Sequence, residues 1–480
     1  LALVWEDKGG TDIGSLLHAT LAKVRRHARI GILLDAFWDN AFCRAIVSGM
    51  EQGTELAFEQ GLLKFRATSA FCDLAPEAAV THTVTGRGRL VVNLGDQLIL
   101  KNYRWMLPGI HPELEISRFL TETAKFSHIA QLAGTVEYAD SEGHESTLAI
   151  LESYGKNQGN AWAYTLSYLE RFLDECLIRP EREEPAEQSR PAERPEHGLQ
   201  ARHAAYMNLM KTLGVRTAQF HQALALPGAS GAFAAAAAPT AGVAEEFGRE
   251  PVTEDDIAEW INGTRTELDA AYALLVRELP RLPAELRSVG ASLAAARPRL
   301  TRRIVKIAAS LSGSARTAGI TKARVHGDYH LGQVWLSSND FLIANYGSGP
   351  GLTWEERRRK QSPLRDVAGM LPSFSQAAAA ALGEVAADSP ESAGMLRRHA
   401  EEWHALAARH FYRSYRKTMA GYDLFPSGPG EAEALVTLFT IGKAAAGLSS
   451  AFSQQAKTIG HLMRELTRLS RISPRKKQEG

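Results

Sequence analysis

The feature that most constrains the fold of this chain is a change in its hydrophobic pattern near residue 157. Before this point, residues 90–94 and 97–101 are short apolar runs separated by a Gly-Asp dipeptide, which is typical of a two-residue β-hairpin turn. After it, large apolar residues recur every three or four positions, as on one face of a helix: Trp162, Leu166, Leu169 and Phe172. The pattern predicts an α+β chain in which a small sheet-containing part precedes a mainly helical part.

The sheet-containing part is expected to span residues 81–155. Besides the hairpin it contains Pro112, which is suited to the first position of a helix because it lacks the N–H that a helix start leaves unpaired. Two further apolar runs, at 129–138 and 147–153, are separated by turn-forming residues and predict strands. A hairpin, a short helix and two more strands would make one lobe.

The rest of the chain, residues 156–480, is expected to be mainly helical. Two short apolar runs, 334–336 and 341–344, interrupt the helical pattern and predict a small embedded hairpin. The stretch 179–198 is rich in Pro, Glu and Arg, and it is too polar and too often broken by proline to bury a core. We expect it to be an exposed loop.

Residues 1–80 are expected to form a small N-terminal cap. Within them, residues 11–60 suggest two amphipathic helices around the apolar run 31–35, and residues 65–79 mix strand and loop signals. Because the chain begins with Leu1 and not Met, we expect it to be a piece of a longer polypeptide and the cap to be truncated.

Composition excludes several classes of partner. The chain has 55 Lys and Arg against 54 Asp and Glu, a net charge of +1, so it offers no general attraction to nucleic acid or to anionic lipid. Its basic end is expected to be a solvated tail, since no aromatic residues are interleaved with it for base stacking: Arg464, Arg468, Arg471, Arg475, Lys476 and Lys477. No run of about 18 strongly apolar residues predicts a membrane span. Three cysteines without a CxxC motif favour a reducing cytoplasm.

The segment 324–346 carries the most specific chemical signal. Asp328 is followed five positions later by the amide Gln333, which is the spacing of the protein-kinase catalytic loop. In that loop the Asp accepts the proton of the substrate hydroxyl and the amide residue binds magnesium. Two alternatives remain open: His326, Asp328 and His330 could converge on zinc, or His326 could brace the loop through backbone hydrogen bonds.

Lys101 ends the second strand of the predicted hairpin, and a helix with two glutamates follows it. In kinases a strand lysine contacts the nucleotide phosphates and a helix glutamate holds that lysine. Glu115 is the first candidate for the glutamate and Glu113 the second. A strand Lys, a helix Glu and a catalytic loop occur in the order that a kinase requires, so together they predict phosphoryl transfer from a nucleotide.

Several longer motifs resemble bacterial maltokinases, which are often fused to trehalose synthase. They lie at 108–122, 157–162, 213–221, 326–334 and 361–371, and the resemblance extends over about residues 30 to 440. It implies a bilobed protein-kinase-like fold, similar to aminoglycoside phosphotransferases, behind an N-terminal cap. It also implies phosphorylation of the anomeric hydroxyl of maltose, or a related sugar, by ATP with Mg²⁺. The product would be maltose 1-phosphate, used in α-glucan and trehalose metabolism.

The resemblance also assigns roles to individual residues. Asp328 would be the catalytic base, Gln333 a magnesium ligand and Lys101 the lysine that contacts phosphate. Asp366, near the start of the helix that follows Ser362 and Pro363, would brace the catalytic loop; an acidic residue is also favoured there by the helix N-terminus itself. A trehalose-synthase partner, fused or associated, and a cytoplasmic location are further implications.

The sequence departs from this family where the chemistry is most demanding. Asn345 stands where the family has its main metal-binding Asp, and a neutral amide is a poorer ligand for a hard divalent cation. The family's phosphate-covering turn is replaced by residues 86–91, in which Arg87 or Arg89 would have to contact phosphate. Two hypotheses therefore stand: an active enzyme that uses Gln333 and Asn345 as metal ligands, or a pseudokinase that binds and regulates within a trehalose-synthase system.

Overall fold

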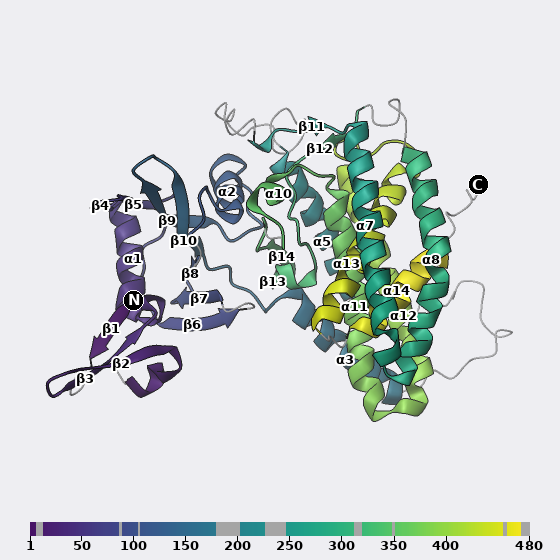
Figure 1. Cartoon of the computed structure of the whole chain (residues 1–480), viewed down its shortest axis with the longest axis horizontal. Helices are drawn as coiled ribbons and strands as arrows, with labels where there is room; N and C mark the ends of the chain where they lie inside the picture. Colours follow the sequence, from purple (N-terminus) through teal and green to yellow (C-terminus); the bar gives the residue numbers. More distant parts are fainter. Residues whose placement is uncertain are drawn as a thin grey trace. The chain divides into compact units, whose positions relative to one another are not determined.

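The structure is a computed structural model in which two compact units are distinguished, Leu1–Lys156 and Asn157–Gly480. Figure 1 traces both along the chain. The structure describes residues 1–5, 13–85, 89–103, 106–178, 202–225, 246–311, 319–347, 351–454 and 458–471. The exposed loop predicted at 179–198 lies outside this described part of the chain. Each unit is considered by itself below.

The first unit is built on a seven-stranded antiparallel sheet with the strand order β4-β5-β9-β10-β8-β7-β6. Its strands are β4 Glu55–Phe58, β5 Gly61–Ala67, β6 Val80–Thr85, β7 Arg89–Leu94, β8 Leu98–Asn102, β9 Leu132–Asp140 and β10 Glu145–Ser153. The predicted hairpin is confirmed as β7 and β8, but Leu94 pairs with Leu98, so three residues, 95–97, connect the strands instead of the predicted two. Gly95 and Asp96 have φ of 64° and 52°, the left-handed conformation that a tight hairpin turn requires.

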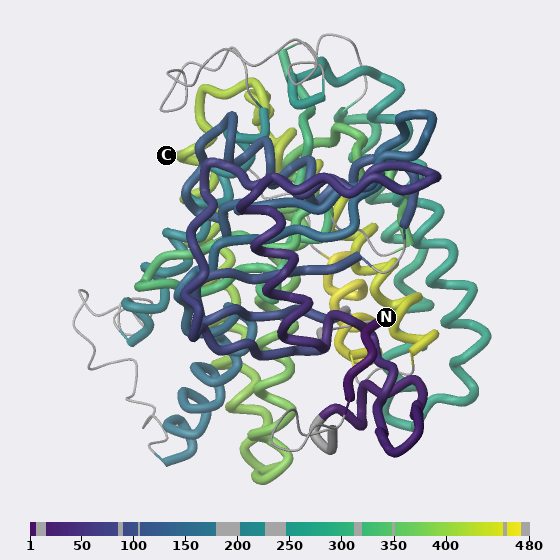
Figure 2. Tube along the Cα trace, turned by 90° about the vertical axis from the view of Figure 1, so that its left-hand side faces the viewer, coloured from purple at the N-terminus to yellow at the C-terminus, as the bar shows by residue number. Residues whose placement is uncertain are grey.

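Helix α1, Asn40–Gln52, covers one face of this sheet and lies across its strands in Figure 2. Asp39 caps its start by accepting the Ala41 N–H at 2.9 Å, and Gly53, with φ of 62°, ends it. Its buried face packs against the sheet in one apolar cluster: Cys43, Ile46, Val47 and Met50. Apolar burial between this helix and the sheet is what fixes the strands that carry Lys101.

The expectation for the N-terminal residues is partly wrong. Residues 20–34 form a hairpin, β2 Thr20–Arg26 and β3 Arg29–Leu34, which joins β1 Ala2–Trp5 in a separate three-stranded sheet. Two short 3₁₀ helices accompany it, Ile13–Ala19 and Ala36–Trp38. The apolar run at 31–35 therefore forms the end of strand β3 and the residue that follows it, because apolar side chains also suit a paired strand. Moreover, β4 and β5 continue the main sheet across the boundary expected at residue 80.

The second unit is mainly helical, as its periodicity predicts. Its helices are α3 Ala161–Ile178, α5 Ala204–Leu224, α7 Glu254–Glu278, α8 Ala284–Leu311, α10 Trp354–Arg358, α11 Leu364–Asp388, α12 Ala393–Met419, α13 Glu431–Gln454 and α14 Ile459–Arg471. The embedded hairpin is confirmed as β13 Val334–Ser337 and β14 Asp340–Ile343. A second short pair joins β11 Glu250–Pro251 to β12 Thr321–Lys322, just before the catalytic loop.

Helix α11 lies at the centre of this unit and packs against α3, α12 and α13. Large side chains fill the space around it without solvent access: Phe374, Trp403, Phe411 and Tyr415. Among the described residues one helix, α13, is long and apolar enough to cross a membrane by length and composition alone. Half of its most apolar window is buried inside the protein (50%), as in a core helix, so it is weak support for a span.

Candidate functional site

In the first unit, Lys101 lies in a buried cluster of charges. Its Nζ is 3.0 Å from Glu113 Oε1 on α2, Pro112–Arg118, and 2.7 Å from Glu152 Oε2 on the neighbouring strand β10. All three side chains are buried, so the charges interact with little screening by water. Two carboxylates, Glu113 and Glu152, therefore contact the ammonium group of Lys101.

Helix α2 is set so that Glu113 points at this lysine. Pro112 occupies the first helical position, and the His111 ring accepts the Glu113 N–H at 3.1 Å as the N-cap. Tyr103 stacks on that ring, with centroids 4.0 Å apart, and donates its hydroxyl to Glu113 Oε2 at 2.8 Å. The carboxylate is thus held by the helix N-terminus and by a tyrosine as well as by Lys101.

The structure describes only some of the other residues predicted for this site in the first unit. Glu113, the second candidate, is in contact with Lys101, whereas Glu115, the first candidate, is buried on the same helix turn. Arg87 and the side chain of Arg89 lie outside the described residues. Glu152 was not identified from the sequence, because a glutamate in a strand is recognised as a partner of Lys101 only when the order of the strands is known.

In the second unit, the predicted catalytic loop, within residues 324–346, is held by one buried carboxylate. Asp366 Oδ2 accepts the backbone N–H of His326 at 2.7 Å and Asp366 Oδ1 accepts that of Gly327 at 3.1 Å. His221, on α5, donates to Oδ2 at 3.1 Å and contacts the Tyr415 hydroxyl at 3.0 Å through its other nitrogen. Asp366 therefore occupies the position where the sequence predicts a brace for the loop.

Charge balance around Asp366 favours the ionised form. Burial alone would raise its pKa, but the hydrogen bond from His221 and the nearby positive charge of Lys443 outweigh that effect and lower it. The carboxylate thus provides acceptors for all three donors in a position without solvent access. This is an arrangement that fixes backbone geometry, because each donor would otherwise be buried without a partner.

The neutral ring of His326 connects the backbone at Asp328 with the backbone at Ala344. Its Nδ1 accepts the Asp328 N–H at 3.3 Å, so its Nε2 carries the proton and donates to the Ala344 carbonyl at 2.9 Å. Burial lowers its pKa despite the nearby Asp366. Both ring nitrogens are therefore engaged with the backbone. This geometry matches the bracing alternative and leaves His326 unable to ligate zinc together with Asp328 and His330.

Asp328 lies at the edge of a cavity of about 330 Å³ within the second unit. Its side chain is 32% exposed, and Oδ2 is 3.9 Å from His330 Nε2. The polar groups around the cavity come from the loop, α11, α13 and α14, and they include Asp328, His330, Gln376, Lys443, Ser450, Gln454, His461 and Glu465. A carboxylate on a fixed loop, beside a cavity rich in hydrogen-bonding groups, can orient a hydroxyl compound and accept its proton.

Lys443 is the functional candidate that sequence reasoning missed. It lines the same cavity from α13, an apolar helix. Burial lowers its pKa, while Asp366 and Asp328 act in the opposite direction. The loop, α11 and α13 approach closely here, because a Cβ on Gly369 would lie 2.5 Å from the Tyr329 carbonyl oxygen and 3.3 Å from Lys443 Nζ. A single lysine within an apolar helix was the available signal.

The two predicted metal ligands contact each other. Asn345 Nδ2 donates to Gln333 Oε1 at 2.8 Å, across the β13–β14 hairpin. Asn345 has φ of 59°, a left-handed conformation that asparagine tolerates better than most residues. Among the described residues, no group of three or more His, Cys, Asp or Glu side chains could hold a metal ion. Two neutral amides bonded to each other do not fit Mg²⁺, which prefers carboxylate oxygens.

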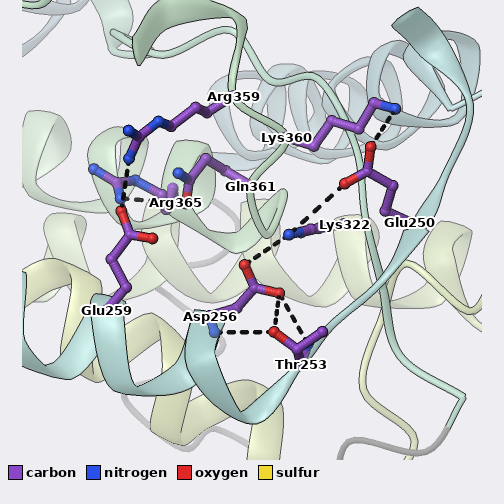
Figure 3. A network of polar contacts seen from close by, with 9 residues as sticks. All are labelled: Glu250, Thr253, Asp256, Glu259, Lys322, Arg359, Lys360, Gln361 and Arg365. Carbon is purple, nitrogen blue, oxygen red and sulfur yellow. Dashed lines mark hydrogen bonds and ion pairs between the residues drawn. The ribbon is translucent and has the colours of Figure 1, made fainter. Parts of the chain in front are cut away.

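A polar network holds the chain as it enters the catalytic loop (Figure 3). Lys322 Nζ is 2.6 Å from Asp256 Oδ1 and 3.7 Å from Glu250 Oε2. The next residue, Ala323, exchanges two backbone hydrogen bonds with Gln361, at 2.7 and 3.1 Å. Asp256 belongs to the capping box that starts α7. The loop is therefore connected to α7 on one side and to the segment that leads into α11 on the other.

Comparison with known proteins adds two findings. No family model matches the chain. Glucosamine kinase from Streptacidiphilus jiangxiensis is 28% identical over 211 residues, which are 44% of this chain and 38% of that protein. The chain therefore matches well under half the length of this curated relative.

Two solved structures of glucosamine kinase resemble the fold. One, in complex with glucosamine, ADP and inorganic phosphate, has a TM-score of 0.59 at 19% identity and covers 93% of this chain and 85% of its own. The other, crystal form B, has a TM-score of 0.59 at 19% identity and covers 91% and 85%. The chain thus has a kinase-like fold, with a sheet-containing N-terminal region and a helical C-terminal part. The predicted fold class is confirmed.

Proposed function

We propose that this protein is an ATP-dependent sugar kinase in which Asp328 is the catalytic base. The observation that carries the proposal is the position of the Asp328 carboxylate, beside a cavity and on a loop fixed by Asp366. The kinase-like fold and the matching segment of a glucosamine kinase support the same reaction class. Lys101, held by Glu113 and Glu152, would contact the nucleotide phosphates.

The proposed chemistry is one transfer. The acceptor hydroxyl oxygen forms a bond to the terminal phosphorus of ATP, the bond from that phosphorus to the bridging oxygen breaks, and ADP leaves. Asp328 accepts the hydroxyl proton. Its partial exposure leaves it open to a substrate, while the hydrogen bonds of His326 and Asp366 keep its backbone in place. No step is assigned to Mg²⁺, since Gln333 and Asn345 do not fit it.

For the acceptor we propose a neutral sugar, with maltose or a related glucoside first. The family resemblance supports maltose and maltose 1-phosphate, whereas the relative with a matching segment is a glucosamine kinase. A neutral sugar avoids placing a protonated amine beside the ammonium group of Lys443, although the carboxylates of Asp328 and Glu465 line the same cavity and carry the opposite charge. Association with trehalose synthase and a cytoplasmic location, where Cys43, Cys72 and Cys176 would remain reduced, belong to the same proposal.

The second candidate function is a pseudokinase, and one observation favours it. The amide pair of Asn345 and Gln333 stands where metal ligands are expected, so charge stabilisation at the transferring phosphate is weaker than a carboxylate would provide. Such a protein would bind a sugar or nucleotide and regulate a partner without turnover.

The test is product formation with ATP and a panel of maltose, glucose and glucosamine. Asp328→Asn is the control, because it keeps the shape of the side chain and removes its basicity. Sugar phosphate that forms with the wild type and not with this variant supports the kinase. Absence of product above the variant for every sugar, with the protein folded, would reject it in favour of the pseudokinase.

A further inference from the structure

A second and larger cavity lies among the helices of the second unit. Its volume is about 1040 Å³, and its walls come from α8, α11, α12, α13 and α14. It adjoins the cavity of Asp328 and shares Pro372, His461 and Glu465 with it, but Asp328 and Lys443 do not line it. The proposed kinase reaction gives it no role. Its size is in the range of cavities that bind small organic molecules.

The charges around this cavity are strongly positive. Five arginines line it, from α8, α12 and α14: Arg303, Arg397, Arg464, Arg468 and Arg471. Two acidic residues oppose them, Glu401 and Glu465. The whole chain has a net charge of only +1, so this one cavity concentrates more positive charge than the protein carries overall.

Few of these charges are neutralised within the protein. Arg468 donates to Glu465 through both Nε, at 2.9 Å, and Nη2, at 2.5 Å. Within the part of the chain that the structure describes, Arg397, Arg464 and Arg471 form no hydrogen bond and no ion pair. Three guanidinium groups on two helices therefore keep their donors available to a ligand.

The arginines also repel one another. Burial lowers the pKa of Arg464, and the positive charge of Arg397 lowers it further. Arg303 is affected in the same way, by burial and then by Arg468. Like charges that are held together at a cavity wall destabilise the unliganded protein, and an anion between them would relieve the repulsion.

Apolar side chains, most of them alanines, also line the cavity. They include residues from α11 and α12: Ala378, Leu382, Ala400 and Ala405. Small side chains such as alanine leave room for the body of a ligand, and the arginines line the same cavity. The planar guanidinium fork matches a phosphate group through paired hydrogen bonds better than an ammonium group would.

We propose that this cavity binds an organic phosphate, with the phosphate group between Arg397 and Arg464 and the rest of the molecule against the apolar side chains of α11 and α12. The proposal concerns a site separate from Asp328 and does not depend on whether the protein catalyses phosphoryl transfer.

The test is a calorimetric titration with glucose 1-phosphate, in the full chain and without ATP. We expect saturable binding that weakens at least about tenfold in the double variant Arg397→Gln, Arg464→Gln, because two charge-assisted contacts are lost. Arg398→Gln is the matched control: it changes the adjacent residue of α12, which is exposed and does not line the cavity. It should bind as the wild type does.

Inorganic phosphate in a parallel titration distinguishes the source of the affinity. Weaker binding than that of glucose 1-phosphate, lost in the same double variant, supports a site that also recognises the organic part. Equal binding of both ligands, an unchanged affinity in the double variant, or no saturable binding at all would overturn the proposal. Circular dichroism spectra that match the wild type ensure that the variants are folded. Loss of kinase activity in Asp328→Asn would leave these results unaffected.

Discussion

Replacement of Asp366 by Asn tests whether a buried carboxylate holds the catalytic loop. Asp366 accepts three donors, the N–H groups of His326 and Gly327 and the ring of His221. Asparagine keeps one oxygen, so its amide NH₂ must face at least one of these donors. Losing a charge-assisted hydrogen bond costs about 1.5–3 kcal/mol, and leaving a buried donor unpaired adds about 1–3 kcal/mol. We expect Asp366→Asn to reduce the unfolding free energy by about 3–5 kcal/mol.

Thermal unfolding followed by circular dichroism measures this effect. For a unit of this size, about 1 kcal/mol shifts Tm by about 1.5 °C, so the transition of the helical unit should move down by about 4–8 °C. Asp388→Asn is the matched control, since Asp388 is exposed on the same helix, and it should change stability by less than about 0.5 kcal/mol.

The pH dependence gives a second test of the same residue. The pKa of Asp366 is lowered in the folded protein, so its stabilisation is present above the unfolded-state pKa of about 3.9 and is lost as pH falls through the folded-state pKa. The stability advantage of the wild type over Asp366→Asn should therefore shrink as pH falls below about 4. Equal Tm values at neutral pH, or a difference that persists unchanged in acid, would refute the role assigned to this carboxylate.

Three further predictions concern the neighbours of Asp328. Asn345→Asp places a carboxylate at the expected metal position, so in the presence of Mg²⁺ it should raise kcat by about 10²-fold. The control is Asn339→Asp, the same change at another asparagine in the left-handed conformation, with φ of 63°. It should have no effect on kcat. Gly369→Ala puts a Cβ 2.5 Å from a loop carbonyl, so it should lower the free energy of unfolding, measured with denaturant, by about 1–3 kcal/mol. The control is Gly383→Ala, which lies on the same helix with open space around it and should be neutral or slightly stabilising. Lys443→Met removes the charge that repels an amino sugar, so kcat/KM for glucosamine relative to maltose should rise at least about tenfold; an unchanged ratio would contradict the proposed selectivity.

Local patterns in the sequence were sufficient for much of the fold. The turn at Gly95 and Asp96 specifies the β7–β8 hairpin, and Pro112 specifies the start of α2, because each depends on backbone preferences of adjacent residues. The residues before α1 were misinterpreted, because a short apolar run fits a helix face and a paired strand equally well. Only pairing with a distant segment, β1 with β3, decides between them.

Prediction of the candidate site from the sequence was likewise limited to residues in contiguous motifs. The spacing of Asp328 and Gln333 identified the loop, and Asp366 was recognised by resemblance, because both belong to contiguous motifs. Glu152 and Lys443 come from a neighbouring strand and a distant helix, so no local spacing identifies them. Order along α2 did not identify Glu113 as a partner of Lys101 either, since the orientation of the helix determines that contact.

The most direct test of the central claim is ³¹P NMR of the full chain with ATP, Mg²⁺ and maltose, compared with the same mixture containing Asp328→Asn. We predict a new phosphate ester resonance that grows as ADP appears with the wild type and is absent with the variant. Equal rates in both samples would show that Asp328 is not the base. ADP and ester formation absent from both, in protein that unfolds cooperatively, would contradict the assignment as a kinase.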